Sequence, residues 1–209
     1  MASTISKKVN IGSGYVYDII LDETFPAEKT IAKLKTWLDT AIDDDNRIGN
    51  IKGGFKTDIT TSATNDKDDM GEIRVDELTG EDGKVSFALF NSNAQTIERI
   101  YPTAKYSEEK IDGKTWGMVA VGGIGNKTDE QHVIVFRHPS TADGDTVIIA
   151  VGKNMEGFSD EYKPDGVTPL SVAYNIQPLN DTGRLFFKLD VPKDYKWPGL
   201  NKTVAEIPE

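Results

Sequence analysis

The residues that most often perform acid–base or metal chemistry are scarce in this chain. Its 209 residues include two histidines, His132 and His138, and no cysteine. The six-residue spacing of the histidines places them on one face of an extended strand but roughly 20 Å apart, too far for a shared metal ion. No serine lies in a nucleophile elbow, and no paired carboxylates suggest a catalytic cleft. The sequence therefore predicts no enzyme, no metal centre and no cofactor.

Three acidic clusters offer oxygen atoms to a cation, at residues 43–46, 66–69 and 143–145. Read as a calcium-binding loop that begins at Asp44, the chain has Ile48 where an oxygen donor belongs and Phe55 where the final glutamate belongs. The match to a calcium loop fails. These clusters indicate solvated acidic surface rather than a metal site.

The negative charge is concentrated in one part of the chain. The formal net charge is -10, and residues 39–82 hold thirteen acidic and five basic residues, which accounts for eight of those charges. A protein that grips duplex DNA needs the opposite sign, because lysine and arginine must displace counterions from phosphate. Tight static binding of nucleic acid is therefore not expected, and solvated loops are the plainest interpretation of the acidic segment.

One segment of the chain has the pattern of an amphipathic helix. Between residues 27 and 42, apolar side chains recur at three- and four-residue steps. Pro26 suits a first helical turn, and the run of acidic residues from Asp43 onward ends the helix near Ile42. We expect this helix to cover one face of a sheet. A second, short helix is predicted at residues 93–100.

Most other segments have the alternation and turn residues of short strands, at residues 15–21, 48–60, 71–78, 84–90, 115–121, 132–137, 146–151, 168–177 and 185–191. The pair Asp82-Gly83 between two of them predicts a tight hairpin turn. In the strand at 71–78, Ile73 and Val75 are expected to point inward. The pattern predicts a mainly β protein, an antiparallel β-sandwich or barrel with one or two flanking helices.

The chain ends read as extended arms around a single domain. Residues 1–13 are polar and lack periodicity, and prolines recur through residues 192–209. The sequence thus predicts one domain over 1–209, with an N-terminal arm at 1–13, a β-sandwich at 14–191 and a C-terminal arm at 192–209. No apolar run is long enough for a membrane span, so no membrane contact is expected.

A second class of function remains open, because β-sandwiches also serve as carbohydrate-binding modules. Such modules stack sugars on exposed aromatic rings. Trp37 lies on the apolar face of the predicted helix and Trp116 within a predicted strand, which leaves Trp197 as the tryptophan expected in a loop. A monomeric β-sandwich that binds a ligand or carbohydrate is the alternative reading.

The order of patterned segments resembles one known family. A glycine-marked strand at 48–56 leads to a polar acidic loop that ends in Asp-Asp-Met-Gly-Glu-Ile-Arg-Val at 68–75. An alternating strand, a short helix and a strand that ends in residues 119–123 follow. Two further segments, at 132–138 and 144–149, come next. This order is similar to that of the major tail tube proteins of long-tailed, non-contractile bacteriophages, and the similarity covers roughly residues 11–191.

The resemblance implies a structural virion protein rather than an enzyme. Hexameric rings of such a protein stack into the tail tube, through which DNA passes into the host without specific binding. The implied partners are other copies of the chain and further tail proteins: the tape measure, the tail terminator and the distal tail protein. The implied location is the virion tail, after assembly in the host cytoplasm.

The resemblance also implies which segments join the rings. A loop at residues 57–70 and the terminal arms would do so. The corresponding residues are Thr57, Thr60, Thr61, Asp66, Lys67, Asp68 and Asp69 in the loop, and Lys7, Lys8, Tyr195 and Trp197 in the arms. The helix at 27–42 is longer than the family pattern, which leaves its place in a ring open.

Overall fold

The computed structural model describes residues 13–67, 70, 74–140, 142–162, 169–180 and 182–200. Strands make up 51% of the structure and helices 14%, so the predicted mainly β fold with flanking helices is confirmed. Along the chain the elements are β1 (Tyr15–Ile20), α1 (Ile31–Ala41), β2 (Arg47–Lys67), β3 (Arg74–Leu89), α2 (Ala94–Ile100), β4 (Ala104–Ile111), β5 (Lys114–Val121), the short 3-10 turn η1 (Ile124–Asn126), β6 (His132–His138), β7 (Thr146–Lys153), β8 (Phe158–Ser159), β9 (Leu170–Gln177), β10 (Phe186–Asp190) and the 3-10 turn η2 (Pro198–Leu200).

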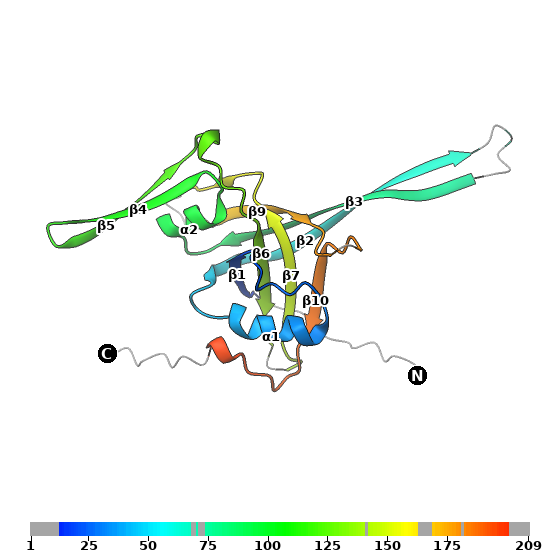
Figure 1. Cartoon of the computed structure of the whole chain (residues 1–209), viewed down its shortest axis with the longest axis horizontal. Helices are drawn as coiled ribbons and strands as arrows, with labels where there is room; N and C mark the ends of the chain where they lie inside the picture. Colours follow the sequence, from blue (N-terminus) through cyan, green and yellow to red (C-terminus); the bar gives the residue numbers. More distant parts are fainter. Residues whose placement is uncertain are drawn as a thin grey trace.

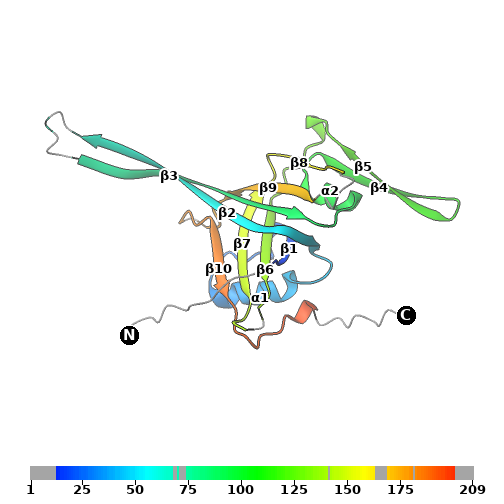
Figure 2. The same cartoon turned by 180° about the vertical axis from the view of Figure 1, so that it is seen from behind.

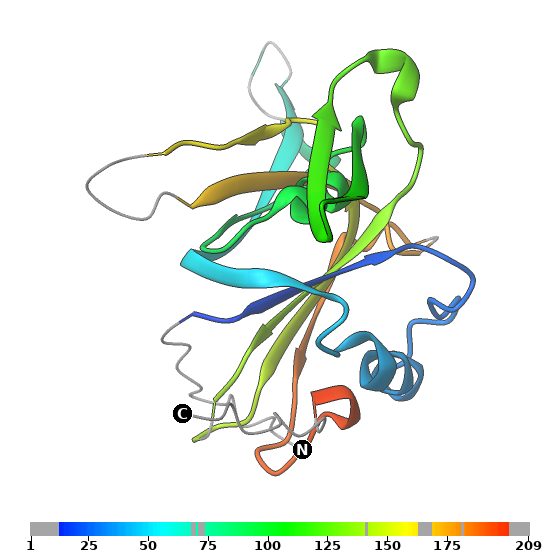
Figure 3. The same ribbon diagram turned by 90° about the vertical axis from the view of Figure 1, so that its left-hand side faces the viewer.

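The main sheet is antiparallel and closes on itself. Its strand order is β10-β7-β6-β1-β2-β3-β9-β8, and β7 pairs in addition with β9 where Val151 faces Gln177. Strands β7, β6, β1, β2, β3 and β9 thereby enclose a barrel, while β10 and β8 lie at its edges (Figure 3). Of the two predicted forms, the barrel describes the sheet better. Strands β4 and β5 pair only with each other in a separate two-stranded sheet.

Alternation along the strands creates two cores. On β6, Ile134 and Phe136 face the barrel interior, whereas Val133 and Val135 face outward against α1. Because both faces of this strand are covered, its sequence is apolar almost throughout. The interior also contains stacked rings, with Phe55 4.5 Å from Phe136 between centroids. Burial on both sides of the β6 and β7 wall therefore gives the barrel its rigid side.

Helix α1 covers the outer face of that wall, as predicted (Figure 1). Leu34, Trp37 and Leu38 are buried against it. The helix begins at Ile31, four residues later than the sequence predicted, because the side chain of Thr30 caps the N–H of Lys33. Its end near Ile42 is confirmed, and the backbone N–H of Ile42 closes the last turn on the carbonyl of Leu38.

The short helix α2 is also confirmed and contributes to the interior core. Asn93 and Thr96 form a reciprocal capping box at its start, which satisfies two amides that would otherwise lack partners. Ile100 is buried among the interior side chains, and Ile97 packs against them. The buried amide of Asn154 holds the end of the helix by donating to the carbonyl of Ile100 at 2.8 Å.

The hairpin turn predicted at Asp82-Gly83 is wrong. Strand β3 runs without interruption from Arg74 to Leu89, with Asp82 opposite Thr60 and Gly83 opposite Ile59 on β2. An Asp-Gly pair turns the chain only where no partner strand continues alongside it, and here β2 does continue. Gly83 serves a different purpose, because a Cβ there would lie 2.3 Å from Cγ1 of Ile176 on β9.

The C-terminal segment is not an extended arm over residues 192–200. Trp197 is buried in the outer core, and η2 packs against α1. Gly199 approaches so closely that a Cβ there would lie 2.4 Å from the carbonyl oxygen of Ile42. Prolines exclude this segment from the sheet, but its aromatic residues fasten it to the barrel instead. Residues 201–209 and the N-terminal residues Lys7 and Lys8 lie outside the described residues.

Candidate assembly surfaces

The longest projection from the barrel is the outer part of the β2–β3 hairpin. Pairing of β3 with β9 ends where Gly83 faces Ile176, but pairing of β2 with β3 continues to Lys67 and Arg74. We call residues 60–67 and 74–82 the arm. It extends away from the barrel as a twisted two-stranded ribbon (Figures 1 and 2). Such a ribbon is marginal in water unless something packs on it, which makes the arm a candidate contact surface.

The two faces of the arm differ in chemistry. Residues directly opposite each other share a face, so Ala63 and Leu78 lie on the face that continues from Ile59 and, nearer the barrel, from buried Val85. A shift of one residue between Ser62 and Ala63 preserves this alignment. Leu78 is 65% exposed. Beyond Ile59, this face of the arm thus carries one exposed apolar pair, Ala63 and Leu78, after Thr61 and Glu81, and no described residue covers it.

The opposite face of the arm is acidic. Asp58 lies at its base, and Asp82, Glu77 and Asp66 follow along it, with the Ser62–Gly80 pair between Asp82 and Glu77. Val75, opposite Asp66, is exposed. The expectation that Val75 points inward is therefore wrong, since none of the described elements packs on the arm and Val75 is 51% exposed. Lys56 forms an ion pair with Asp58 at 2.9 Å, but Lys56 lies on the barrel rather than on the arm. Clustered carboxylates leave this face with a negative potential.

The second projection is the β4–β5 hairpin, which we call the short hairpin (residues 104–121). It leaves the barrel at the end opposite to the arm along the longest axis of the molecule (Figures 1 and 2). The sequence predicted β5 but missed β4, because β4 is charged and has little apolar alternation. Helix α2 supports the base of the hairpin, where Glu98 accepts the backbone N–H of Tyr106 at 2.8 Å.

The short hairpin also has two unlike faces. On one, the ring of Tyr106 lies over Gly117, where a Cβ would come within 2.4 Å of the phenol oxygen. On the other, Trp116 and Met118 are 62% and 63% exposed, and Ile111 lies at the tip of the same face. Soluble proteins seldom leave such a row of large apolar side chains in water without a use for it.

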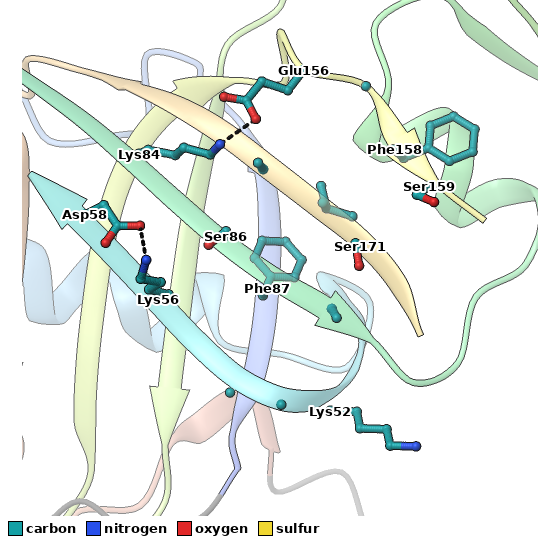
Figure 4. A pocket seen from close by; sticks show the side chains of 16 residues that line it. Lys52, Lys56, Asp58, Lys84, Ser86, Phe87, Glu156, Phe158, Ser159 and Ser171 are labelled. Atoms are coloured by element: carbon teal, nitrogen blue, oxygen red, sulfur yellow. Dashed lines mark hydrogen bonds and ion pairs between the residues drawn. The ribbon is translucent and has the colours of Figure 1, made fainter. Parts of the chain in front are cut away.

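A third surface is the outer side of the barrel wall formed by β2, β3 and β9. Small residues cover it, among them Ser86 and Ser171, and it forms a shallow depression of about 670 Å³ with β8 at its edge (Figure 4). Three lysines line it, and two of them are held in ion pairs, Lys56 with Asp58 at 2.9 Å and Lys84 with Glu156 at 2.5 Å. The surface is smooth and has few side chains that could hold a ligand.

A polar cluster in the barrel interior joins three strands. Asp18 on β1 is fully buried; its carboxylate meets Nδ1 of His132 at 2.6 Å and accepts the hydroxyl of Tyr174 at 3.1 Å. Burial works to lower the pKa of His132, but the hydrogen bond and charge of Asp18 outweigh it and raise that pKa above its ordinary value. Burial, together with Asp18, raises the pKa of Tyr174 well above its ordinary value.

That cluster fits a structural role. His132 borders a cleft beside α2 and the short hairpin, which also contains Glu98 and Glu130. No group of three or more potential metal ligands occurs among the described residues. The second histidine, His138, is buried and hydrogen-bonds through Nδ1 to the carbonyl of Ser13.

A partly buried ion pair fastens the C-terminal segment. The carboxylate of Asp145 accepts Nε of Arg137 at 2.6 Å and the indole N–H of Trp197 at 2.8 Å. Burial works to raise the pKa of Asp145, but these hydrogen bonds outweigh it and hold the pKa below its ordinary value. Tyr195 donates its hydroxyl to Asp39 on α1. The expectation that Trp197 is an exposed loop residue is therefore wrong.

The residues predicted to join rings fall into distinct places. Thr60, Thr61, Asp66 and Lys67 lie in strand β2 on the arm, so this segment is not the irregular loop that the sequence suggested. Thr57 is part of the barrel wall, and its buried hydroxyl finds no hydrogen-bond partner among the described residues. Asp68 and Asp69 lie outside the described residues. Tyr195 and Trp197 contact their own α1 side of the barrel rather than projecting from it.

Comparison with known proteins adds no relative. The sequence matches no protein-family model, and no curated protein matches it. Within the described ranges, no helix is long and apolar enough to cross a membrane.

Proposed function

We propose that this chain is the subunit of a self-assembling tube, of the kind that forms the tail of long-tailed, non-contractile bacteriophages. The observation that carries the proposal is the arm: a long paired ribbon on which Leu78 is 65% exposed and is covered by none of the described residues. Burying a leucine side chain contributes about 2 kcal/mol, so contact with another copy stabilises the assembled form. Hexameric rings stacked through the arms are the proposed assembly.

The charge distribution supports a conduit for DNA. A tube through which a genome slides must not bind phosphate, and carboxylates on its wall repel it. The smooth surface of small residues on β3 and β9, with two of its three lysines held in ion pairs, is suited to such a wall. In this proposal the partners are other copies of the chain, the tape measure, the tail terminator and the distal tail protein. The place of action is the virion tail, after assembly in the host cytoplasm.

The strand register supplies a direct test. Because Ile59 and Gly83 are paired, residues 60–82 can be replaced by Asn-Gly, which closes a two-residue hairpin at the barrel edge. Pairing of β3 with β9, which begins at Gly83, remains intact. We expect the shortened protein to fold with a cooperative thermal transition but to form no tubes in negative-stain electron microscopy, whereas the intact chain forms hollow tubes or six-fold rings.

Two results would contradict the proposal. One is an intact chain that remains a 23.0 kDa monomer by light scattering at high concentration. The other is a shortened protein that still grows long tubes, which would show that the arm has no part in assembly.

The alternative of a monomeric carbohydrate-binding module has one observation in its favour. Trp116, rather than Trp197, is the exposed tryptophan of the described chain, and with Met118 it forms an apolar platform of the size of a sugar ring. A glycan array on the intact protein tests this alternative. Specific binding that Trp116→Ala abolishes, from a protein that stays monomeric, would favour the module.

A further inference from the structure

The open face of the short hairpin is the other large uncovered apolar surface on a projection. Trp116, Met118 and Ile111 lie in alternate cross-strand positions on it, each at least 46% exposed. Lys105 and Lys114 occupy the two ends of this face, with Glu109 between them. The surface is therefore an apolar strip with a basic residue at each end.

The apolar face of the arm has the complementary composition. Ala63 and Leu78 form its strip, in continuation of Ile59 at the barrel edge. Glu81 and Asp76 occupy cross-strand positions on the same face, and Lys67 lies at its outer end. Both surfaces are two-stranded ribbons of similar width, so one can lie along the other with apolar strips in contact and carboxylates near the lysines.

The directions of the two projections determine which kind of assembly a contact between the arm and the short hairpin would form. The arm and the short hairpin leave the barrel at opposite ends of the molecule (Figures 1 and 2). Two different patches at opposite ends cannot satisfy each other within one copy. A contact between them is head-to-tail, and head-to-tail contacts propagate from copy to copy.

We infer that the short hairpin is the receiving surface for the arm of another copy of this chain, with Trp116 and Met118 packed against Leu78. This inference rests on the proposed tube, and it names the partner of each surface. The arm of one ring would lie on the short hairpin of the next ring. Each subunit thus contributes one arm and one receiving hairpin to the stack.

Complementary variants test the pairing. Leu78→Lys damages the arm and leaves the short hairpin intact, whereas Trp116→Lys does the reverse. Each variant alone is expected to form single rings that do not stack. When the two are mixed, intact arms of one can meet intact hairpins of the other once, so the particle mass should double and growth should then stop. Light scattering and electron microscopy measure this.

A matched control comes from a side chain of similar exposure elsewhere. Ile31 on α1 is 78% exposed and lies on neither surface, so Ile31→Lys should form tubes as the unchanged protein does. Since the chain has no cysteine, Leu78→Cys and Trp116→Cys introduce the only thiols. Mixed under oxidation, they should give a disulfide-linked dimer of two chains.

The outcomes separate this inference from the proposed function. If the unchanged chain forms no assembly, the tube proposal itself fails. If the unchanged chain forms tubes but Trp116→Lys forms them equally well, or the cysteine pair gives no cross-link within tubes, the tube stands and the assigned receiving surface is wrong. Thermal melts of both lysine variants should match the unchanged chain, because each site is exposed.

Discussion

Nδ1 of His132 lies 2.6 Å from the carboxylate of Asp18, inside a barrel whose core is built largely from apolar side chains. A buried carboxylate needs a partner, and this one has two, since Tyr174 also donates to it at 3.1 Å. The three residues come from β1, β6 and β9, so the cluster ties together strands that are distant in the sequence.

The first prediction concerns the pH dependence of stability. The pKa of His132 is raised by Asp18 against the opposing effect of burial; Glu130 also raises it and Arg99 lowers it. A raised folded-state pKa stabilises the protein fully below the ordinary histidine pKa of about 6.5, and this stabilisation is lost as the pH rises through the folded-state value. Urea unfolding should therefore show a free energy of unfolding that falls from about pH 6 to pH 8.

Two histidine variants provide the comparison. His132→Gln should flatten the slope over this interval, while His138→Gln, which leaves the Asp18 contact intact, should retain it. A slope that is the same in His132→Gln and in the unchanged protein would contradict this account of the cluster.

The second prediction concerns Asn154, which joins α2 to the barrel. Its amide donates to the carbonyl of Ile100, and its side-chain oxygen accepts the N–H of Gly157 at 2.9 Å. Asn154→Leu leaves these buried groups without partners and should lower the free energy of unfolding by about 2 kcal/mol. Asn154→Asp keeps the acceptor and loses the donor, so a loss confined to the leucine variant would show that the Ile100 contact contributes nothing.

The third prediction concerns the C-terminal segment. Trp197 is 4% exposed and donates its indole N–H to Asp145. Trp197→Ala should lower the free energy of unfolding by about 3 kcal/mol, because it leaves a cavity beside α1. Trp197→Phe keeps most of the packing and loses the hydrogen bond, so it should lose less. Chemical denaturation of the two variants tests the order, and equal losses would contradict it.

The fourth prediction uses substitutions at two glycines of β3 to test whether the strand is continuous. At Gly83 a Cβ would meet the side chain of Ile176 at 2.3 Å, whereas at Gly80 its nearest neighbour would be Cβ of Ser62 at 3.8 Å. Gly83→Ala should therefore lower the melting temperature through a loss of about 1–3 kcal/mol, and Gly80→Ala should leave it nearly unchanged. Equal destabilisation at both positions would favour a turn at Asp82-Gly83 over the continuous strand.

Local pattern was sufficient to predict the elements that alternate strongly. Val85, Phe87 and Leu89 point into the barrel as their spacing predicts, and the start of α2 follows from the cap at Asn93. The mainly β class, the position of α1 on the sheet and the lack of a helix that could span a membrane in the described chain agree with the same patterns.

Features that depend on a distant partner could not be predicted in this way. Asp82-Gly83 has the local chemistry of a turn, but pairing with Ile59 and Thr60 holds it in a strand. Trp197 lies between Pro192 and Pro198 and has the sequence context of a loop residue, yet its indole N–H donates to Asp145, 52 positions earlier. The prediction for each failed because long-range pairing and burial outweigh local preference.

The amino-acid sequence by itself determined the class of the fold, the scarcity of catalytic residues and the concentration of negative charge between residues 39 and 82. Only the tertiary structure decided that three of these acidic residues, Asp66, Glu77 and Asp82, lie on one face of a projecting arm, while Leu78 lies on the other. The reason is physical: the face of a residue in a ribbon depends on its register with the partner strand, and cross-strand pairing sets that register.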